Sequence, residues 1–361
     1  MNFSFHYATI KFLARLAGFP DGEAQIIAYA SQYVDDSTEH RPFYVQNLPR
    51  IHRLRFDKYG RFEPTCTAHY KLDDILNPSP EVQHKVFIPF HFLPSGLRVG
   101  ESRLPPTYPD PVITRTPKKP DYSDRDFDWQ TQRGSILARA VLDEALGAVK
   151  FRHDERERFL IKLGIALHTY ADTWAHQGFS GRNCQDENDV QAIKEKRGKN
   201  WFEVRSPLMR LLDRTRFIGH LQAGRYPDRP WHVWDLQKAG RVDWSYRDNS
   251  LIFVNAANAI YRQLRKIRSL EPEGLPLESE HVLLRLFKQR IPCPDLFYRW
   301  RTLRQWRKAI PSVFFAYDPG LWRDQALHEH QFIGDHKYFY FHAEAYVQRQ
   351  FVLTQLEVRE K

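Results

Sequence analysis

Apolar residues recur at helical spacing along most of the chain. This spacing predicts two short helices over residues 6–18 and 21–36. It predicts further helices over 129–150, 155–177, 186–197, 204–222, 248–269, 278–290, 295–309 and 337–359. Only residues 86–92 indicate a short extended segment, and no alternation of strands and helices follows it. The pattern therefore predicts a mostly α-helical fold.

Prolines interrupt this pattern in the first third of the chain. They are densest over residues 94–120, which predicts a long proline-rich loop or arm. We find no internal repeat with a period of 20–50 residues. We therefore expect a single large α-helical domain over residues 1–361, with the arm inside it.

Composition narrows the class of protein. A hydrophobic fraction of 42% with 14% aromatic residues indicates a globular chain. No apolar run is long enough for a membrane-spanning helix, and residues 1–6 lack the pattern of a secretory signal. The three cysteines form no CxxC motif, which favours a reducing, cytoplasmic location.

The formal net charge of +10 favours a polyanionic partner, or else serves solubility alone. Residues 298–308 interleave arginine with tryptophan and tyrosine, as nucleic-acid surfaces do. An amphipathic helix with buried aromatic and solvated basic residues has the same pattern. We favour this second interpretation.

Residues 167–178, with the sequence LHTYADTWAHQG, carry the strongest chemical signal. His168, Asp172 and His176 recur every four residues, so they line one face of a helix. Imidazole and carboxylate groups on successive turns can bind a divalent metal ion. The alternative is a buried polar network in which every member has a hydrogen-bond partner.

A second group of polar residues lies near the C-terminus. It could form another metal site, but its spacing does not place it on one helical face, so hydrogen-bonded core residues are the alternative. Its members are His328, His330, Asp335, His336, His342 and Glu344.

The segment LHTYADTWAHQG resembles the metal-binding helix of the zinc-dependent phospholipase C and single-strand nuclease superfamily. Those all-α enzymes hold zinc ions in a helical bundle and cleave phosphodiesters. More closely, five phrases resemble an uncharacterised bacterial family over residues 3–235, without naming a reaction. They are FHYAT, IAYASQYVDD, IPFHFLPSG, HTYADTWAHQGFSG and GHLQAGRYPDRPW.

The superfamily resemblance implies roles for particular residues. His168 and Asp172 would bind the metal cluster, with Asp172 bridging two ions and His176 binding a neighbouring ion. Asp35 or Asp36 would contact a metal and the attacking water, although a solvated helix end is the alternative for this pair. The remaining implied ligands are His6, His69 and His220.

The chain departs from the superfamily pattern in two ways. Asp172 and His176 are closer in sequence than the corresponding pair usually is. Many members also use the amino group of a processed N-terminus as a ligand. Without a signal segment, we expect that ligand to be absent here or replaced by Asp36, His40 or His91.

These observations predict a metal-dependent hydrolase of phosphoester bonds, with two or three zinc ions or other divalent metals. The ions would activate a water molecule, which Asp35 or Asp36 would orient. The expected substrate is an anionic phosphodiester in nucleic acid or a phospholipid headgroup. The alternatives are a binding or assembly protein with a structural metal site, and a toxin or defence component directed at nucleic acid.

Overall fold

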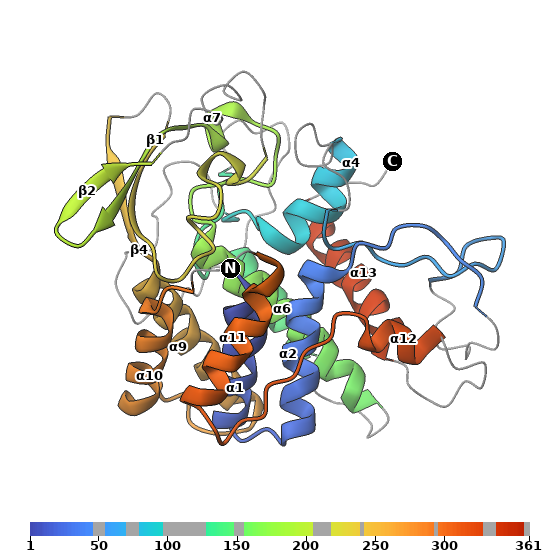
Figure 1. Cartoon of the computed structure of the whole chain (residues 1–361). Helices are drawn as coiled ribbons and strands as arrows, with labels where there is room; N and C mark the ends of the chain where they lie inside the picture. Colours follow the sequence, from blue (N-terminus) through green and yellow to red (C-terminus); the bar gives the residue numbers. More distant parts are fainter. Residues whose placement is uncertain are drawn as a thin grey trace.

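The computed structural model describes residues 1–45, 55–69, 79–96, 128–147, 155–204, 218–238, 242–291, 295–327 and 337–356. Helices dominate these residues, which confirms the mostly α-helical prediction (Figure 1). The first half contains η1 (Ser4–Thr9), α1 (Ile10–Leu16), α2 (Asp21–Asp36), α4 (Pro80–Val82), η3 (Gln83–His91), α5 (Ile136–Gly147), α6 (Arg156–Ala175) and α7 (Gln185–Asn188). The second half contains η6 (Leu221–Ala223), α9 (Asn249–Ile267), α10 (Leu277–Lys288), α11 (Asp295–Ala309), α12 (Leu321–Leu327) and α13 (Lys337–Gln355).

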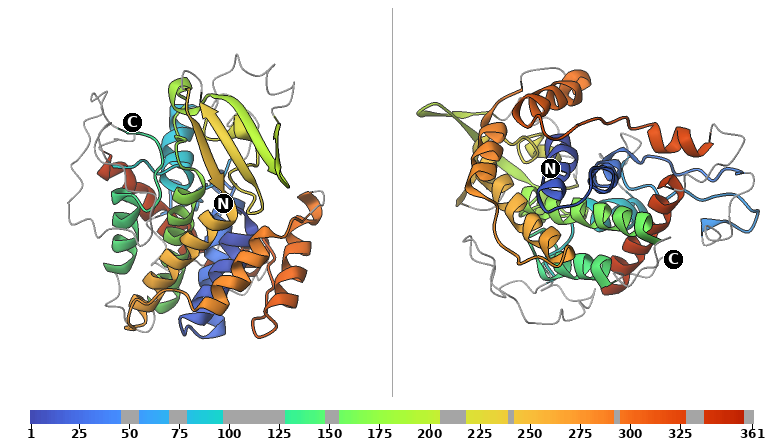
Figure 2. Two further views of the ribbon diagram at one scale, coloured as in Figure 1. Left: turned by 90° about the vertical axis from the view of Figure 1, so that its left-hand side faces the viewer. Right: turned by 90° about the horizontal axis from the view of Figure 1, so that it is seen from below.

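Helix α6 forms the middle of the helical part. Every residue from 163 to 175 is buried, so this stretch is covered on all sides. It packs against α2, α5, α9 and α13, which surround it in the view from below (Figure 2). Polar side chains on α6 are therefore held inside the protein, away from bulk water.

Gly164 allows α2 and α6 to approach closely. A β-carbon at this position would lie 2.4 Å from the Ile27 carbonyl oxygen and 2.7 Å from the Ala30 β-carbon. Because the nearest atom belongs to the backbone of α2, no side-chain rotation could relieve the overlap. The missing side chain therefore sets the distance between the two helices.

We expect Gly164→Ala to lower the melting temperature. Alanine favours a helix over glycine by about 1 kcal/mol, but the forced separation of α2 and α6 should cost about 1–3 kcal/mol. Gly22→Ala is the matched control, because Gly22 lies on α2 with open space around it. Thermal unfolding by circular dichroism would show a loss for Gly164→Ala and no loss for Gly22→Ala. Equal behaviour of the two variants would contradict the role assigned to Gly164.

A four-stranded antiparallel sheet lies at one end of the helices (Figure 1). Its strand order is β2 (Asn200–Glu203), β1 (Val190–Arg197), β3 (Val233–Lys238) and β4 (Trp244–Asp248). Ile193 pairs with Leu236, and Trp234 lies beside them in the same buried cluster. The predicted helix over 186–197 is therefore wrong beyond Asn188. Pairing of β1 with the apolar inner face of β3 overrides the helical preference of its lysine and glutamate residues.

Other parts of the chain also differ from the prediction. Residues 86–92 were expected to be extended, but residues 83–91 form the π-helix η3. Strands β3 and β4 and helix α12 were not predicted. Most of the predicted helix over 204–222, and the proline-rich stretch except residues 94–96, lie outside the described residues.

Among the described helices, none combines the length and apolar character needed to cross a membrane.

Candidate metal centre

Helix α6 presents His168 and Asp172, and His176 follows as the residue that caps its C-terminus. The three side chains meet as their spacing predicts. The Nε2 atom of His168 is 3.3 Å from Asp172 Oδ2, and the Nδ1 atom of His176 is 3.7 Å from the same oxygen. All three residues are at least 95% buried, so their polar atoms depend on partners inside the protein.

Five further side chains reach this region from other segments. They are His6 on η1, Asp35 on α2, His91 at the end of η3, and His220 and Asp228 around η6. Together with the three from α6 they form the candidate metal centre. It contains three groups whose potential ligand atoms lie within 4.8 Å of one another: His6–His168–Asp172, Asp35–His91–His168 and His176–His220–Asp228.

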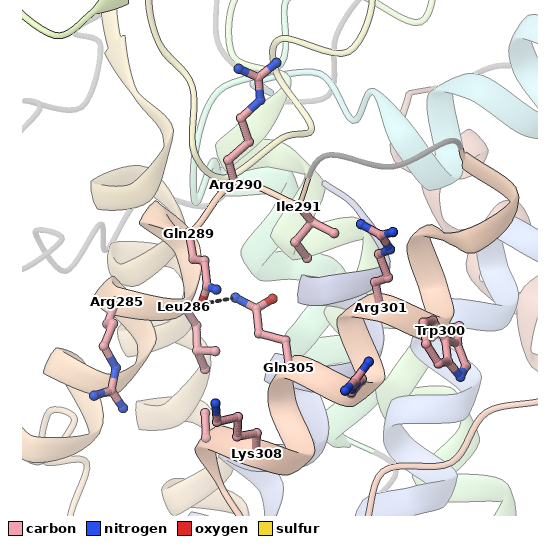
Figure 3. A pocket seen from close by; sticks show the side chains of 11 residues that line it. Arg285, Leu286, Gln289, Arg290, Ile291, Trp300, Arg301, Gln305 and Lys308 are labelled. Carbon is pink, nitrogen blue, oxygen red and sulfur yellow. Dashed lines mark hydrogen bonds between the residues drawn. The ribbon is translucent and has the colours of Figure 1, made fainter.

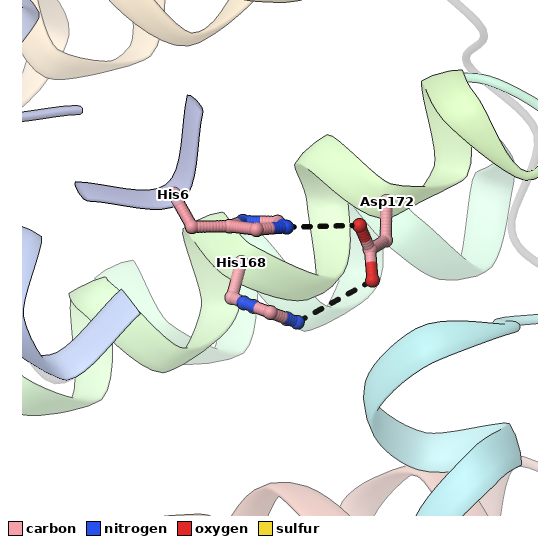
Figure 4. A group of neighbouring side chains, drawn as sticks. All are labelled: His6, His168 and Asp172. Atoms are coloured by element: carbon pink, nitrogen blue, oxygen red, sulfur yellow. Dashed lines mark ion pairs between the residues drawn. The ribbon is translucent and has the colours of Figure 1, made fainter. Parts of the chain in front are cut away.

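Asp172 joins these groups. Its Oδ1 lies 3.1 Å from His6 Nε2 (Figure 4), and its Oδ2 lies 3.3 Å from His91 Nδ1. Burial raises the pKa of this carboxyl group, but the surrounding imidazoles, His176 first, and the Met1 amino group hold it well below its usual value. Asp172 is therefore an ionised carboxylate facing several imidazoles, which is the property that a bridging metal ligand needs.

Backbone carbonyl groups orient four of the histidines. A carbonyl oxygen can only accept a hydrogen bond, so the ring nitrogen beside it must carry the hydrogen. The pairs are His168 Nδ1 with Ser31, His91 Nε2 with Thr67 and His176 Nδ1 with His91, each at 2.8 Å, and His220 Nδ1 with Gly224 at 3.0 Å. In the neutral ring the other nitrogen then has a free lone pair, and in all four histidines it faces the candidate centre.

Two of these lone pairs face each other. His168 Nε2 and His91 Nδ1 are 3.3 Å apart, and each ring already donates its other nitrogen's hydrogen to a carbonyl. Two acceptors at this distance repel unless a proton or a metal ion lies between them or beside them. Burial lowers the pKa of His91, but Asp172 and Asp35 outweigh it and raise the pKa above its usual value. The arrangement therefore favours positive charge at this point.

His6 is the least satisfied member of the candidate centre. It is fully buried, its Nδ1 has no hydrogen-bond partner, and its Nε2 has the Asp172 carboxylate 3.1 Å away. Its ring stacks on His168 with centroids 3.9 Å apart (Figure 4). Burial and the adjacent His168 lower its pKa to about 4, so the ring is neutral at pH 7. A cation beside Asp172 would lie within reach of the His6 Nε2 lone pair, which makes this imidazole a candidate ligand.

The third group lies beyond Asp172 along the same axis. His176 Nε2 is 3.0 Å from Asp228 Oδ1, and His220 Nε2 is 3.4 Å from Asp228 Oδ2. Burial lowers the pKa of His220 to about 4 despite the nearby carboxylate. Two imidazoles and one carboxylate therefore converge here from the end of α6 and the turns around η6.

The Met1 nitrogen also lies in the candidate centre. It contacts the Asp172 carboxylate and lies 3.3 Å from Asp228 Oδ1 and 3.4 Å from His176 Nε2. The prediction that an amino group would be absent from the site is therefore wrong for this structure. Its proposed replacements differ in position: His91 is in the candidate centre, whereas Asp36 and His40 belong to none of its three groups.

A cavity of about 230 Å³ opens onto the candidate centre. Asp35, His91 and Asp228 line it, together with the apolar rings of Phe87 and Phe92. The Asp35 side chain keeps 31% of its surface exposed, whereas that of Asp172 keeps 2%. A small molecule or a phosphoryl group could therefore reach the site from the Asp35 side.

A sequence profile for a family of unknown function (DUF6765) matches residues 1–356. The chain belongs to this family. Neither a curated protein nor a solved structure matches the chain.

Asp36 was predicted together with Asp35 but lies outside the three groups. It forms an ion pair with Arg299, and Tyr317 donates a hydrogen bond of 2.5 Å to its carboxylate. Neighbouring residues on a helix project about 100° apart, so only one of the two aspartates can face α6. Asp35 is that residue, and Asp36 instead anchors the end of α2 to α11.

His69 was also predicted as a ligand and lies outside the three groups. It is exposed at the cavity wall, where its ring stacks with Phe87 at a centroid distance of 6.4 Å. His40 is likewise exposed, and its Nδ1 is 3.4 Å from the Thr38 carbonyl oxygen. Neither position provides the buried, fixed imidazole found in the candidate centre.

Asp228 was not among the predicted ligands, and His91 was considered only as a replacement. Both belong to phrases that carried the family resemblance, IPFHFLPSG and GRYPDRPW. An aspartate in a turn between prolines has no periodicity to mark it. Its proximity to His176 depends on how the turns around η6 fold back onto α6.

The second metal site suggested near the C-terminus finds no support in its described members. His342 is fully buried and lies 3.0 Å from the Thr65 backbone nitrogen, while Glu344 pairs with Arg158. These contacts fit the alternative of hydrogen-bonded core residues. His328, His330, Asp335 and His336 lie outside the described residues.

Proposed function

We propose that the protein is a metal-dependent hydrolase of phosphoester bonds, with phosphodiesters as its first substrate class. The observation that carries the proposal is the pair of facing acceptors, His168 Nε2 and His91 Nδ1, beside an ionised Asp172. A proton or a metal ion beside these nitrogens would remove their repulsion, and each of the three adjoining groups could hold an ion. The resemblance of residues 167–178 to zinc-dependent phosphodiesterases supports the same assignment.

The chemistry of the donors favours zinc. Imidazole nitrogens combined with aspartate oxygens suit zinc, whereas magnesium and calcium prefer oxygen ligands alone. Histidines held through their second ring nitrogen are the usual support of such a site. His6 and His168 with Asp172 would hold one ion, His91 and Asp35 a second, and the group around His176 a third.

Bound divalent ions would supply Lewis acidity toward phosphoryl oxygens and make a water molecule more acidic. Asp35 is placed to orient that water, because its carboxylate faces the cavity and lies 3.8 Å from His168 Nε2. Burial raises the pKa of Asp35, but His168, His6 and His91 outweigh it and lower the pKa below its usual value. Asp35 would therefore be ionised at neutral pH and able to accept a hydrogen bond.

The test compares two histidines on the same cavity, one inside the candidate centre and one outside it. Purified wild-type protein should contain zinc by elemental analysis and hydrolyse an aryl phosphodiester. His91→Ala should lose bound metal and at least about tenfold in turnover, since even supporting residues of metal sites are worth 10–100-fold. His69→Ala should keep its metal content and stay within about twofold of wild type.

Metal-free wild-type protein, or equal losses in the two variants, would contradict the proposed metal site. Metal binding without hydrolysis of any phosphoester tested would instead favour a structural metal site, and the hydrolase proposal would fail.

A further inference from the structure

A second cavity, of about 830 Å³, lies between α10 and α11 (Figure 3). The two helices form a hairpin, and Gln305 donates a hydrogen bond of 2.8 Å to Gln289 across the gap between them. We call this cavity the basic groove. Its cationic lining residues are Arg285, Arg290, Arg301, Arg304 and Lys308, and the remainder are Leu286, Gln289, Ile291, Trp300, Gln305 and Ala309.

All the charged residues that are described in the lining of the basic groove are positive. Five of its lining residues are cationic and exposed, and none of its described lining residues is acidic. Other arginines on the same helix are used differently. Arg299 pairs with Asp36, and Arg307 donates to the Phe315 carbonyl at 2.7 Å. Arg299 and Arg307 of α11 therefore contact other parts of the fold, whereas Arg301, Arg304 and Lys308 line the groove.

This concentration of like charge is unfavourable for the folded chain alone. Arg304 and Lys308 are four residues apart, so they are neighbours on one helical face. Like charges at such spacing destabilise a helix by a few tenths of a kcal/mol per pair. A bound anion with several negative charges would attract these cations, so that their closeness would become favourable.

Exposed aromatic rings lie beside these cations. Trp300 lines the basic groove with 58% of its surface exposed, and Phe297, one helical turn earlier, is 52% exposed. The Arg304 guanidinium carbon lies 5.7 Å from the centre of the Trp300 ring. The interpretation of residues 298–308 as an amphipathic helix holds for Trp306, which is fully buried, but not for Trp300.

We propose that the basic groove binds single-stranded nucleic acid, with phosphates against the cations and bases stacked on Trp300. Channels for single strands combine a basic groove with exposed aromatic rings, because every unpaired base has a face that can stack. A groove also favours a chain of phosphates over a membrane surface, since a flat bilayer would contact only its rim. Base-paired duplexes would not offer free faces to Trp300.

The N-terminal end of α11, the helix that carries part of the basic groove, lies near the candidate metal centre. Asn2 donates a hydrogen bond of 2.8 Å to the Tyr298 hydroxyl, and the preceding Met1 lies in the candidate centre. A strand that extended from the groove past the N-terminal end of α11 would therefore approach the metal site. The inference does not rest on the proposed hydrolysis, because binding can be measured without metal.

The test measures binding of a fluorescein-labelled oligothymidylate of twelve nucleotides by fluorescence anisotropy, in the presence of chelator. The double variant Arg304→Ala/Lys308→Ala should weaken binding about tenfold or more. The plot of log K against log salt concentration should also become less steep, by about 1.4 in slope, or about 0.7 for each lost phosphate contact. The matched control is Lys58→Ala/Lys199→Ala, which removes the same charge from exposed positions outside the groove. Its affinity should stay within about twofold of wild type.

The tryptophan separates stacking from charge. Trp300→Ala should weaken oligothymidylate binding about fivefold or more, because stacking on one base is worth about 1–3 kcal/mol. The same variant should bind inorganic polyphosphate as wild type does, since polyphosphate has no bases.

Three results would overturn the proposal. One is an absence of oligothymidylate binding by wild type, and another is equal weakening in the groove variant and its lysine control. The third is binding to vesicles containing phosphatidylserine that depends on Arg304 and Lys308 while oligothymidylate binding does not, which would make the basic groove a membrane contact.

Discussion

Asp172→Asn is expected to give a folded protein with little bound zinc and at least about a hundredfold less phosphodiesterase activity. Asparagine has nearly the same shape as aspartate but no negative charge. It would leave His6, His91 and His168 around a neutral amide, where the wild type has an ionised carboxylate. An amide is also a poor bridge between two cations. Elemental analysis and turnover of an aryl phosphodiester would measure both effects.

The control for Asp172→Asn is Asp143→Asn, the same change at an exposed position on α5. It should retain wild-type metal content and turnover. Breaking a buried charge interaction costs about 3–5 kcal/mol, so Asp172→Asn should also melt earlier while keeping its helical circular dichroism spectrum. Full metal content and activity in Asp172→Asn would show that Asp172 is not a ligand of a catalytic metal.

Removal of metal by a chelator is expected to lower the melting temperature of the wild-type protein by several degrees. The candidate ligands come from η1, α2, η3, α6 and the turns around η6, so bound ions would connect segments that are distant in sequence. Ligand present at a hundred times its dissociation constant stabilises the folded state by about 3 kcal/mol. For domains somewhat smaller than this chain, each kcal/mol shifts the melting temperature by about 2–4 °C.

Adding zinc back should restore the original melting temperature. The Asp172→Asn variant should respond much less to chelator, because it would have little metal to lose. An identical melting curve for wild type with and without chelator, in protein shown to contain metal beforehand, would mean that the metal does not link these segments.

The sequence was informative where neighbouring positions share one face of a helix. The four-residue intervals between His168, Asp172 and His176 placed three polar groups together, and the apolar residues around them indicated that the helix is buried. The mostly α-helical fold followed from the same periodicity. Both inferences depend on local geometry, which a single sequence contains.

Features that depend on tertiary packing could not be predicted in this way. Whether Asp35 or Asp36 faces α6 depends on the rotation of α2 about its own axis, which the packing of the helices decides. Asp228 approaches His176 only because separate turns fold onto the helix. Strand β1 contains residues that favour helices, and its structure comes from pairing with β3.

The basic groove is a second example of a feature that depends on tertiary packing. The sequence indicated basic and aromatic residues on one segment, but not which of them face outward. Only the packing of α11 distinguishes the buried Trp306 from the exposed Trp300.

The carbonyl groups that orient the histidines have a consequence for how this site tolerates mutation. A main-chain oxygen remains when its side chain is replaced, so substitutions at Ser31 or Thr67 would leave the imidazoles held as before. His91 and Gly224 are the exceptions, because His91 is itself a candidate ligand and the φ of 57° and ψ of −126° at Gly224 suit only glycine. Ser31 and Thr67 could therefore vary among small residues without loss of the support, while insertions that shift the backbone would disable it.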